Sequence, residues 1–185
     1  MTYQLHIRKA ANKLYHRQII AYPTEGLYGL GCLPDHQTTV LKLLSLKKRS
    51  PKTGLILISD KIEKFADLIE DEWMTLLLSK AKWPGPETWI VPTTKKTPKW
   101  ITGGKSTLAV RITNHPVARS LCSLLDIPLV STSANKTNHP AARSALEVRY
   151  IFKNKIDYIL HGKTGGLKGA TPIRELQSGN YLRHG

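Results

Sequence analysis

Cysteine is scarce in this chain of 185 residues. Cys32 and Cys122 are the only two, they lie far apart in the sequence, and neither has a metal-ligand spacing with any of the seven histidines. A disulfide framework needs more cysteines, and a zinc site needs Cys and His in close spacing. We therefore expect both cysteines to be reduced core residues of a cytosolic protein.

Long apolar runs are also absent. No stretch approaches the roughly 18 apolar residues that a membrane span needs, and the N-terminal residues mix charge with apolar residues at helical spacing. These features predict a cytoplasmic protein with no export signal and no membrane partner. The sequon at Asn135 is accordingly not interpreted as a glycosylation site.

Several catalytic motifs are missing as well. There is no H-E-x-x-H, C-x-x-C or G-x-S-x-G, so zinc hydrolysis and Ser-His-Asp hydrolysis lack support. The segment from Gly103 to Thr107 reads G-G-K-S-T, but a P-loop needs a glycine five positions before Gly104, where Lys99 stands. The other glycines never form the dinucleotide-binding fingerprint. None of these motifs explains the chain.

Acidic residues are few and unevenly placed. Asp and Glu number 13 against 28 Lys and Arg, which gives a formal charge of +15, and the acids gather mainly between residues 60 and 72. This asymmetry suggests a polyanionic partner, either nucleotide phosphates or a nucleic-acid backbone; a generally basic, soluble surface is the alternative. The length, the apolar fraction of 41% and the absence of repeats and linkers predict one globular domain.

The most informative stretch runs from Gln18 to Cys32. An apolar run from Ile19 to Tyr22 is stopped by Pro23, and Thr-Glu-Gly follows at 24–26. This pattern predicts a strand that feeds a loop at the edge where ligands bind in open α/β sheets. We expect the glycines here to allow positive φ and close approach to a ligand, and they are Gly26, Gly29 and Gly31. The alternative is an ordinary glycine-punctuated turn.

The rest of the chain alternates between helical and strand patterns. We expect helices from about Leu5 to Arg17, from a cap at Asp35 until Pro51, and over 62–69, 73–81, 115–125 and 144–152. Strands are expected over 55–58, 88–94, 107–113 and 127–130, and near residues 158, 173 and 181. Because some strands follow each other directly, this order predicts an α/β sheet of mixed direction.

Four loops at strand or helix ends carry groups suited to phosphate or to a small polar ligand. They hold Thr24 to Gly26; Lys47 and Arg49; Thr107 with Arg111; and Ser131, Ser133 and Asn135. Lys and Arg supply charge and donors for phosphate or carboxylate, and Ser, Thr and Asn supply neutral hydrogen bonds. Each loop has a structural alternative, such as a helix cap or a cation that complements a helix C-terminus.

Together these segments resemble one family. P-T-E-G-L-Y-G-L-G-C, K-K-R-S-P-K-T-G-L-I-L-I, W-P-G-P-E-T-W-I-V-P, S-T-L-A-V-R-I-T-N-H-P and P-L-V-S-T-S-A-N occur in the order typical of YrdC-like threonylcarbamoyl-AMP synthases of the TsaC branch. The resemblance runs from about Ile19 to the C-terminus. It implies a single YrdC-like domain over 1–185, with a twisted open sheet of mixed direction and flanking helices.

The resemblance also implies an activity, the first reaction of N6-threonylcarbamoyladenosine (t6A) synthesis at position 37 of tRNA. L-Threonine, bicarbonate and ATP give threonylcarbamoyl-AMP and pyrophosphate, with Mg²⁺ on the ATP and no metal ligand from protein side chains. By motif position, the expected nucleotide-binding residues are Lys47, Arg49, Thr107, Ser133, Asn135 and Arg183, of which Lys47 and Arg49 are also the expected catalytic residues. The expected threonine-binding residues are Thr24, Arg111, Ser131 and Thr171. tRNA and a downstream threonylcarbamoyl-transferase complex are the implied partners.

The rival hypothesis is a module that binds double-stranded RNA or tRNA and acts in rRNA or ribosome maturation. It requires a broad basic face with exposed aromatic side chains outside the pocket. Trp100, which follows Lys95, Lys96 and Lys99, is the one candidate. We nevertheless expect Trp83, Trp89 and Trp100 to be packed residues.

Overall fold

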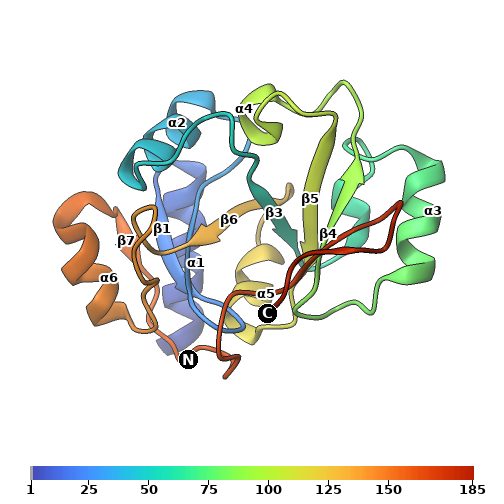
Figure 1. The fold of residues 1–185 in the computed structure, drawn as a ribbon. Coiled ribbons are helices and arrows are strands. Elements are labelled where there is room, and N and C mark those ends of the chain that lie inside the picture. The colour runs from blue at the N-terminus through green and yellow to red at the C-terminus, as the bar shows by residue number, and fades with distance from the viewer. Residues whose placement is uncertain (1) are drawn as a thin grey trace.

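A nine-stranded sheet organises the protein, whose computed structural model describes residues 2–185 (Figure 1). The helices are α1 (Thr2–Tyr15), α2 (Gln37–Leu46), α3 (Asp71–Lys80), α4 (Lys99–Thr102), α5 (Pro116–Cys122) and α6 (Ala145–Phe152), with 3-10 turns η1 (Ile62–Phe65) and η2 (Lys153–Lys155). The strands are β1 (Ile20–Pro23), β2 (Tyr28–Gly31), β3 (Ile56–Ser59), β4 (Thr88–Pro92), β5 (Thr107–Ile112), β6 (Leu129–Ser133), β7 (Tyr158–Ile159), β8 (Ile173–Glu175) and β9 (Tyr181–Arg183).

The strands run in mixed directions, in the order β7-β1-β2-β6-β3-β5-β4-β8-β9. Three of the pairings are parallel, β1 with β7, β3 with β5 and β4 with β8, and the other neighbours pair antiparallel. The predicted α/β sheet of mixed direction is therefore confirmed. Strand β6 lies between β2 and β3, so the segment after residue 128 is placed directly beside the Thr-Glu-Gly loop.

Both faces of the sheet are covered by helices. Successive residues of β1 point to opposite faces, so Ile19 and Ala21 join one apolar cluster while Ile20 and Tyr22 join another. The first cluster contains α2 and α3 side chains, and the second contains those of α1 and α5. Each fully buried Leu or Ile side chain contributes roughly 1.5–3 kcal/mol to this core. Within residues 2–185, no helix is long and apolar enough to cross a membrane.

Two helices begin where the sequence predicts. Pro116 occupies the first turn of α5, and the ring of His115 accepts the amide of Ala118 as the N-cap. Ser144 caps α6 by accepting the amide of Glu147 at 3.2 Å, and the Glu147 carboxylate accepts the amide of Arg143 at 2.9 Å. These reciprocal bonds resemble a capping box and fix the start of α6.

The region around α2 differs from the prediction. Asp35 is not the cap, because His36 takes the extended N-cap conformation and its ring pairs with Thr39 Oγ1 at 2.7 Å. Helix α2 also ends at Leu46, before Pro51, because Lys48 adopts a left-handed φ of 53°. The expected helix over 62–69 is reduced to the turn η1, and the short helix α4 was not predicted.

The glycines after Pro23 also differ from the prediction. Gly29 and Gly31 belong to strand β2 rather than to a loop, and neither they nor Gly26 is among the glycines with positive φ. Their role is spatial. A Cβ at Gly26 would lie 2.1 Å from the carbonyl oxygen of Gly169, and one at Gly31 would lie 2.6 Å from that of Val130. These glycines allow two backbone segments to approach closely.

Candidate active site

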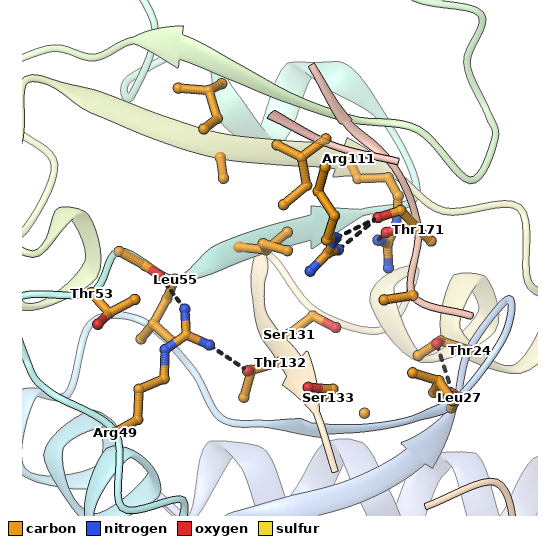
Figure 2. A pocket seen from close by; sticks show the side chains of 18 of the residues that line it. Thr24, Leu27, Arg49, Thr53, Leu55, Arg111, Ser131, Thr132, Ser133 and Thr171 are labelled. Atoms are coloured by element: carbon orange, nitrogen blue, oxygen red, sulfur yellow. Dashed lines mark hydrogen bonds between the residues drawn. The ribbon is translucent and has the colours of Figure 1, made fainter. Parts of the chain in front are cut away.

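A cleft of about 210 Å³ opens over one face of the central strands (Figure 2). Side chains alternate along a strand, and Thr107, Ala109 and Arg111 of β5 all line this cleft. Ala109 is in register with Ile56 of β3, which is in register with Ser131 of β6. The floor of the cleft is thus built from alternate residues of adjacent strands.

Arg111 is a buried cation in this floor. Its Nη1 donates to Thr171 Oγ1 at 2.7 Å and to Thr88 Oγ1 at 3.2 Å. Its Nη2 lies 3.3 Å from Glu25 Oε2, and the two side chains are only 5% and 8% exposed. Glu25 also accepts a hydrogen bond of 2.6 Å from Thr113. Because little water reaches this pair, its attraction is screened less than that of a surface ion pair.

The charge state of Glu25 follows from these contacts. Burial alone raises the pKa of Glu25, because it penalises the charged carboxylate. The attraction of Arg111 and the hydrogen bond from Thr113 oppose burial and prevail, so the pKa of Glu25 is lowered from its ordinary value. Glu25 is therefore ionised at neutral pH and gives Arg111 a permanent counter-charge.

Arg111 retains capacity for a ligand. Its Nε is buried and has no hydrogen-bond partner within residues 2–185. Arg111 itself lines the cleft, and a guanidinium with one unused N–H suits an anionic group such as a carboxylate. Ser131 and Thr24 line the same cleft and add hydroxyl groups, although Thr24 Oγ1 already donates to the carbonyl of Leu27 at 2.8 Å.

Arg49 reaches the cleft from the end of α2. The amide of Arg49 donates to the carbonyl of Leu44 at 3.0 Å and that of Lys48 donates to Ser45 at 2.9 Å, which is the Schellman pattern around a left-handed residue. The Arg49 guanidinium then donates to Thr132 Oγ1 at 3.1 Å and to the carbonyl of Gly54 at 2.9 Å (Figure 2). The helix end therefore fixes the direction of this side chain.

Lys47 does not line this cleft. Its side chain is buried, and its ammonium group donates to the carbonyl of Ser133, to the carbonyl of Asn135 at 2.8 Å and to Asn135 Oδ1 at 3.0 Å. Burial, and then the charge of Arg49, lower the pKa of Lys47 to about 7. In this arrangement Lys47 ties the end of α2 to the end of β6.

Asn135 organises the loop that follows β6. Its Oδ1 accepts from Ser133 Oγ at 2.7 Å, and its Nδ2 donates to the carbonyl of His139 at 2.7 Å. Lys47 and Asn135 both line a second cavity, which shares Arg49, Thr53 and Ser133 with the first. The two residues therefore lie beside the main cleft and orient groups that line it.

Arg183 enters the cleft from β9. Its Nε and Nη2 donate to the carbonyl of Thr171 at 3.1 and 2.6 Å. Burial, and then the charges of Arg111 and Arg49, lower the pKa of Arg183. Three guanidinium groups from distant parts of the sequence thus influence one another across the same cleft, which favours an anionic occupant.

The structure brings most of the predicted site residues together. Those that line the cleft are Thr24, Arg49, Thr107, Arg111, Ser131, Ser133, Thr171 and Arg183. Sequence reasoning did not single out Thr132, Thr88 or Lys105, of which Thr132 and Lys105 line the cleft and Thr88 contacts Arg111. Thr132 could have been found, because it lies between two predicted serines. The contact between Thr88 and Arg111 depends on the register of β4 and β5, which cannot be deduced from the sequence.

The tryptophans and cysteines are packed as predicted. Trp89 is fully buried, Trp83 packs against the core, and Trp100 donates its Nε1 to the carbonyl of Pro34 at 2.8 Å, so the prediction that these residues are packed is confirmed. Residues 2–185 contain no group of three or more His, Cys, Asp or Glu side chains placed to hold a metal ion. Cys32 and Cys122 are free and buried, as predicted.

These features define the class of protein: an α/β protein with a mixed sheet and a cationic, hydroxyl-lined cleft for a small anionic ligand. A family model for Sua5/YciO/YrdC, described as telomere recombination, matches residues 12–185. The chain belongs to this family.

Named relatives and solved structures agree with this membership. The chain is 46% identical over 180 residues to the threonylcarbamoyl-AMP synthase of Halorhodospira halophila, covering 96% of this chain and 93% of that protein. The enzyme of the same name from Pseudomonas fluorescens (strain Pf0-1) is 44% identical over 180 residues, with 96% of each chain covered.

Two solved structures resemble the fold. The P. abyssi Sua5 structure complexed with L-threonine matches with a TM-score of 0.85 at 30% identity, and the match covers 93% of this chain and 51% of that one. The chain thus spans about half the length of that Sua5 protein. E. coli YciO matches with a TM-score of 0.82 at 21% identity, covering 97% of this chain and 89% of that one, which supports the fold alone.

The buried ion pair gives a stability prediction. Replacing Glu25 by Gln leaves Arg111 as a buried charge without its counter-ion, so we expect a loss of about 3 kcal/mol and a fall in Tm on the order of 10 °C at pH 7. Because the folded-state pKa of Glu25 is lowered, its contribution is present above the unfolded-state pKa and is lost as pH falls through the folded-state pKa.

Thermal unfolding of the wild type and Glu25→Gln measured from pH 7 down to pH 3 tests this expectation. The difference in Tm should narrow in the acidic range below the ordinary glutamate pKa of about 4.3. A difference that stays constant across the whole range would show that the charge of Glu25 is not the source of the effect.

Proposed function

We propose that the protein is an L-threonylcarbamoyladenylate synthase, a nucleotidyltransferase that converts L-threonine, bicarbonate and ATP into threonylcarbamoyl-AMP and pyrophosphate. The observation that carries this proposal is the cleft, in which Arg111 and Thr171 lie on one side, Arg49 lies on the other, and Ser131 lies between them (Figure 2). Relatives named threonylcarbamoyl-AMP synthase, more than 40% identical over nearly the whole chain, support the same conclusion.

The side of the cleft with Arg111 is assigned to threonine. Glu25 and Thr171 hold the Arg111 guanidinium in place, and its free Nε–H can bind the threonine carboxylate. Thr24 and Ser131 supply hydroxyl groups for the amino acid, and Thr171 completes the subsite. The negative charge of Glu25 offsets the positive charge of Arg111 at this end of the cleft.

The side with Arg49 is assigned to ATP. Arg49 supplies charge for the phosphates from this side, Arg183 supplies it from beside Thr171, and Thr107 and Ser133 supply neutral contacts to the nucleotide. Lys47 acts at the same end, where it holds Ser133 and Asn135 in place. Asn135 belongs to this group because its side chain orients the Ser133 hydroxyl.

The proposed reaction needs no protein nucleophile. The threonine amine takes up bicarbonate as a carbamate with loss of water, a carbamate oxygen attacks the α-phosphorus of ATP, and the bond to the bridging oxygen of the β-phosphate breaks. The electron pair leaves with pyrophosphate. Positioning both substrates and stabilising the leaving charge are therefore the tasks of the cleft, and Arg49 and Arg183 suit the second task.

We propose that Mg²⁺ enters with ATP as part of the substrate. Among the described residues that line the cleft there is no Asp or Glu, so the walls do not offer the carboxylate oxygens that hold Mg²⁺ in protein sites. Phosphate oxygens and water are then its ligands.

We further propose that residues 1–185 act as one domain in the cytoplasm and that the product serves t6A formation in tRNA. The continuous order of strands from β7 to β9 supports one domain. The acceptor of threonylcarbamoyl-AMP is a downstream threonylcarbamoyl-transferase complex. The rival RNA-binding module is not favoured, because the relatives are named as synthases and Trp100 is packed against the protein.

Pyrophosphate release from ATP is expected to require both L-threonine and bicarbonate, because the carbamate made from them is the group that attacks ATP. The measurement is pyrophosphate release with each substrate omitted in turn. Release at the full rate without threonine would contradict the proposal and indicate a general nucleotidase instead.

Serine is expected to replace threonine poorly. Both amino acids carry a hydroxyl group, so only the methyl group distinguishes them, and a methyl in an apolar contact contributes about 1–3 kcal/mol. We expect kcat/KM for serine to be lower by a factor of roughly 10 to 200. Equal values for the two amino acids would show that the methyl group finds no apolar contact in the cleft.

Arg49→Ala is expected to lower kcat/KM at least about tenfold, since each charge-assisted hydrogen bond to phosphate contributes about 1.5–3 kcal/mol. The side chain is half-buried and bonded to Thr132 and Gly54, so a modest loss of stability accompanies the change. The matched control is Lys155→Ala, an exposed cation remote from the cleft residues in sequence. If both variants retain full threonine-dependent turnover at temperatures well below Tm, Arg49 does not act in the reaction.

A further inference from the structure

The C-terminal hairpin of β8 and β9 forms one wall of the cleft. It and the segment before it contribute Gly169, Ala170, Thr171, Ile173 and Arg183 to the lining. The hairpin lies at the edge of the sheet and is the last segment of the ribbon, drawn in red (Figure 1). Strand β8 pairs with β4 and β9, and all three residues of β9 are exposed. A wall that supplies groups to both ends of the cleft is thus held by a short edge pairing.

Arg174 contacts two aromatic rings across this hairpin. Its guanidinium carbon lies 4.7 Å from the ring centre of Trp89 and 4.8 Å from that of Tyr181. Trp89 of β4 and Tyr181 of β9 are its register partners on the two sides, so the cation lies between two rings across three strands. Both distances are within the range of a favourable cation–π interaction.

Polar contacts complete this arrangement. The Nε and Nη2 of Arg174 donate to the carbonyl of Gly179 in the hairpin turn at 3.2 and 3.0 Å. Its Nη1 lies 3.5 Å from Glu87, which precedes β4, and Tyr181 also donates its hydroxyl to Glu87 at 3.4 Å. Arg174 therefore connects β8, the turn, β9 and β4 through one side chain that is 30% exposed.

Arg174 cannot act by touching the substrates. Residues alternate between the two faces of a strand, and Ile173 and Ile90 line the cleft, whereas Arg174 and its register partner Trp89 do not. The side chain is thus on the face opposite to the cleft. Any effect on the reaction must pass through the position of the hairpin.

The hairpin and the segment that leads into it carry one group for each substrate, and these groups are bonded together. Thr171 accepts a hydrogen bond from Arg111 on the threonine side. Arg183, assigned to ATP, donates twice to the carbonyl of Thr171. Movement of the hairpin would therefore displace both contacts at once.

We propose that Arg174 is a positioning residue that clamps the β8–β9 hairpin against β4, so that Thr171 and Arg183 are in place for threonine and ATP together. This inference rests on the proposed function for the identity of the ligands. If only molecules with a clamped hairpin bind the ligands well, the apparent affinity for each ligand is the intrinsic affinity multiplied by the fraction of molecules in which the hairpin is clamped. Weakening the clamp then lowers both affinities by the same factor, and binding of one ligand restores the affinity for the other.

Arg174→Met tests this proposal, with Lys155→Met as the control of equal charge change. Calorimetry measures the Kd for threonine with and without saturating α,β-methylene-ATP, which cannot release pyrophosphate. We expect Arg174→Met to bind threonine about tenfold more weakly alone and within about twofold of the wild type when the analogue is present. A loss that the analogue does not restore, or no loss, overturns the proposal.

Amide hydrogen exchange gives a readout that does not depend on the identity of the ligands. In Arg174→Met the amides of Glu175 and Gly179 should exchange faster than in the wild type, while those of α1 and β5 stay unchanged. If Arg174→Met does not fold, Tyr181→Leu takes its place. This variant removes one of the two rings at an exposed position, and we expect it to show the same exchange pattern. Unchanged exchange in the hairpin overturns the clamp, whereas failure of the wild type to bind threonine overturns the proposed function instead.

Discussion

The placement of one buried cation constrains the rest of this protein. Arg111 lies in the middle of the sheet, where an unpaired charge is strongly unfavourable. Its partners come from the loop after β1, from β4 and from the segment before β8. Each of these segments must adopt its position for the charge to be compensated, so the core and the cleft depend on the same contacts.

The mixed order of the strands explains how distant segments meet. Strand β6 lies between β2 and β3, which brings Ser131 and Ser133 beside the Thr-Glu-Gly loop on one side and the end of α2 on the other. Lys47 closes this junction by bonding to the carbonyls of Ser133 and Asn135. The two sides of the cleft therefore share β6 as part of a common floor.

The sequence was sufficient for most elements and for the identity of most cleft residues, but not for their partners. Alternating apolar residues and turn signals located β3, β4, β5 and β6 within a few residues. Strand β2 was missed because Gly29 and Gly31 read as a loop, although their absent side chains allow close packing. The end of α2 was placed too late because a left-handed lysine, rather than a proline or glycine, terminates it.

The roles within the site were harder to foresee. Charge patterns indicated that Lys47 and Arg49 belong to the same site. The fold gives them different positions, with Arg49 in the cleft and Lys47 under the neighbouring loop. The pairing of Glu25 with Arg111 joins residues far apart in sequence. Such a contact follows from strand register and from the path of the loops, and neither can be deduced from spacing along one chain.

The alternation along β5 has a consequence for how this protein can evolve. A slip of one residue in that strand would turn Val110 into the cleft and drive the guanidinium of Arg111 into the apolar layer beneath it. A single-residue insertion that shifts the register of β5 would therefore disturb the core packing and the cleft at once. Changes of length are tolerated better in surface connections between elements, where an added residue does not reverse which side chains face the cleft.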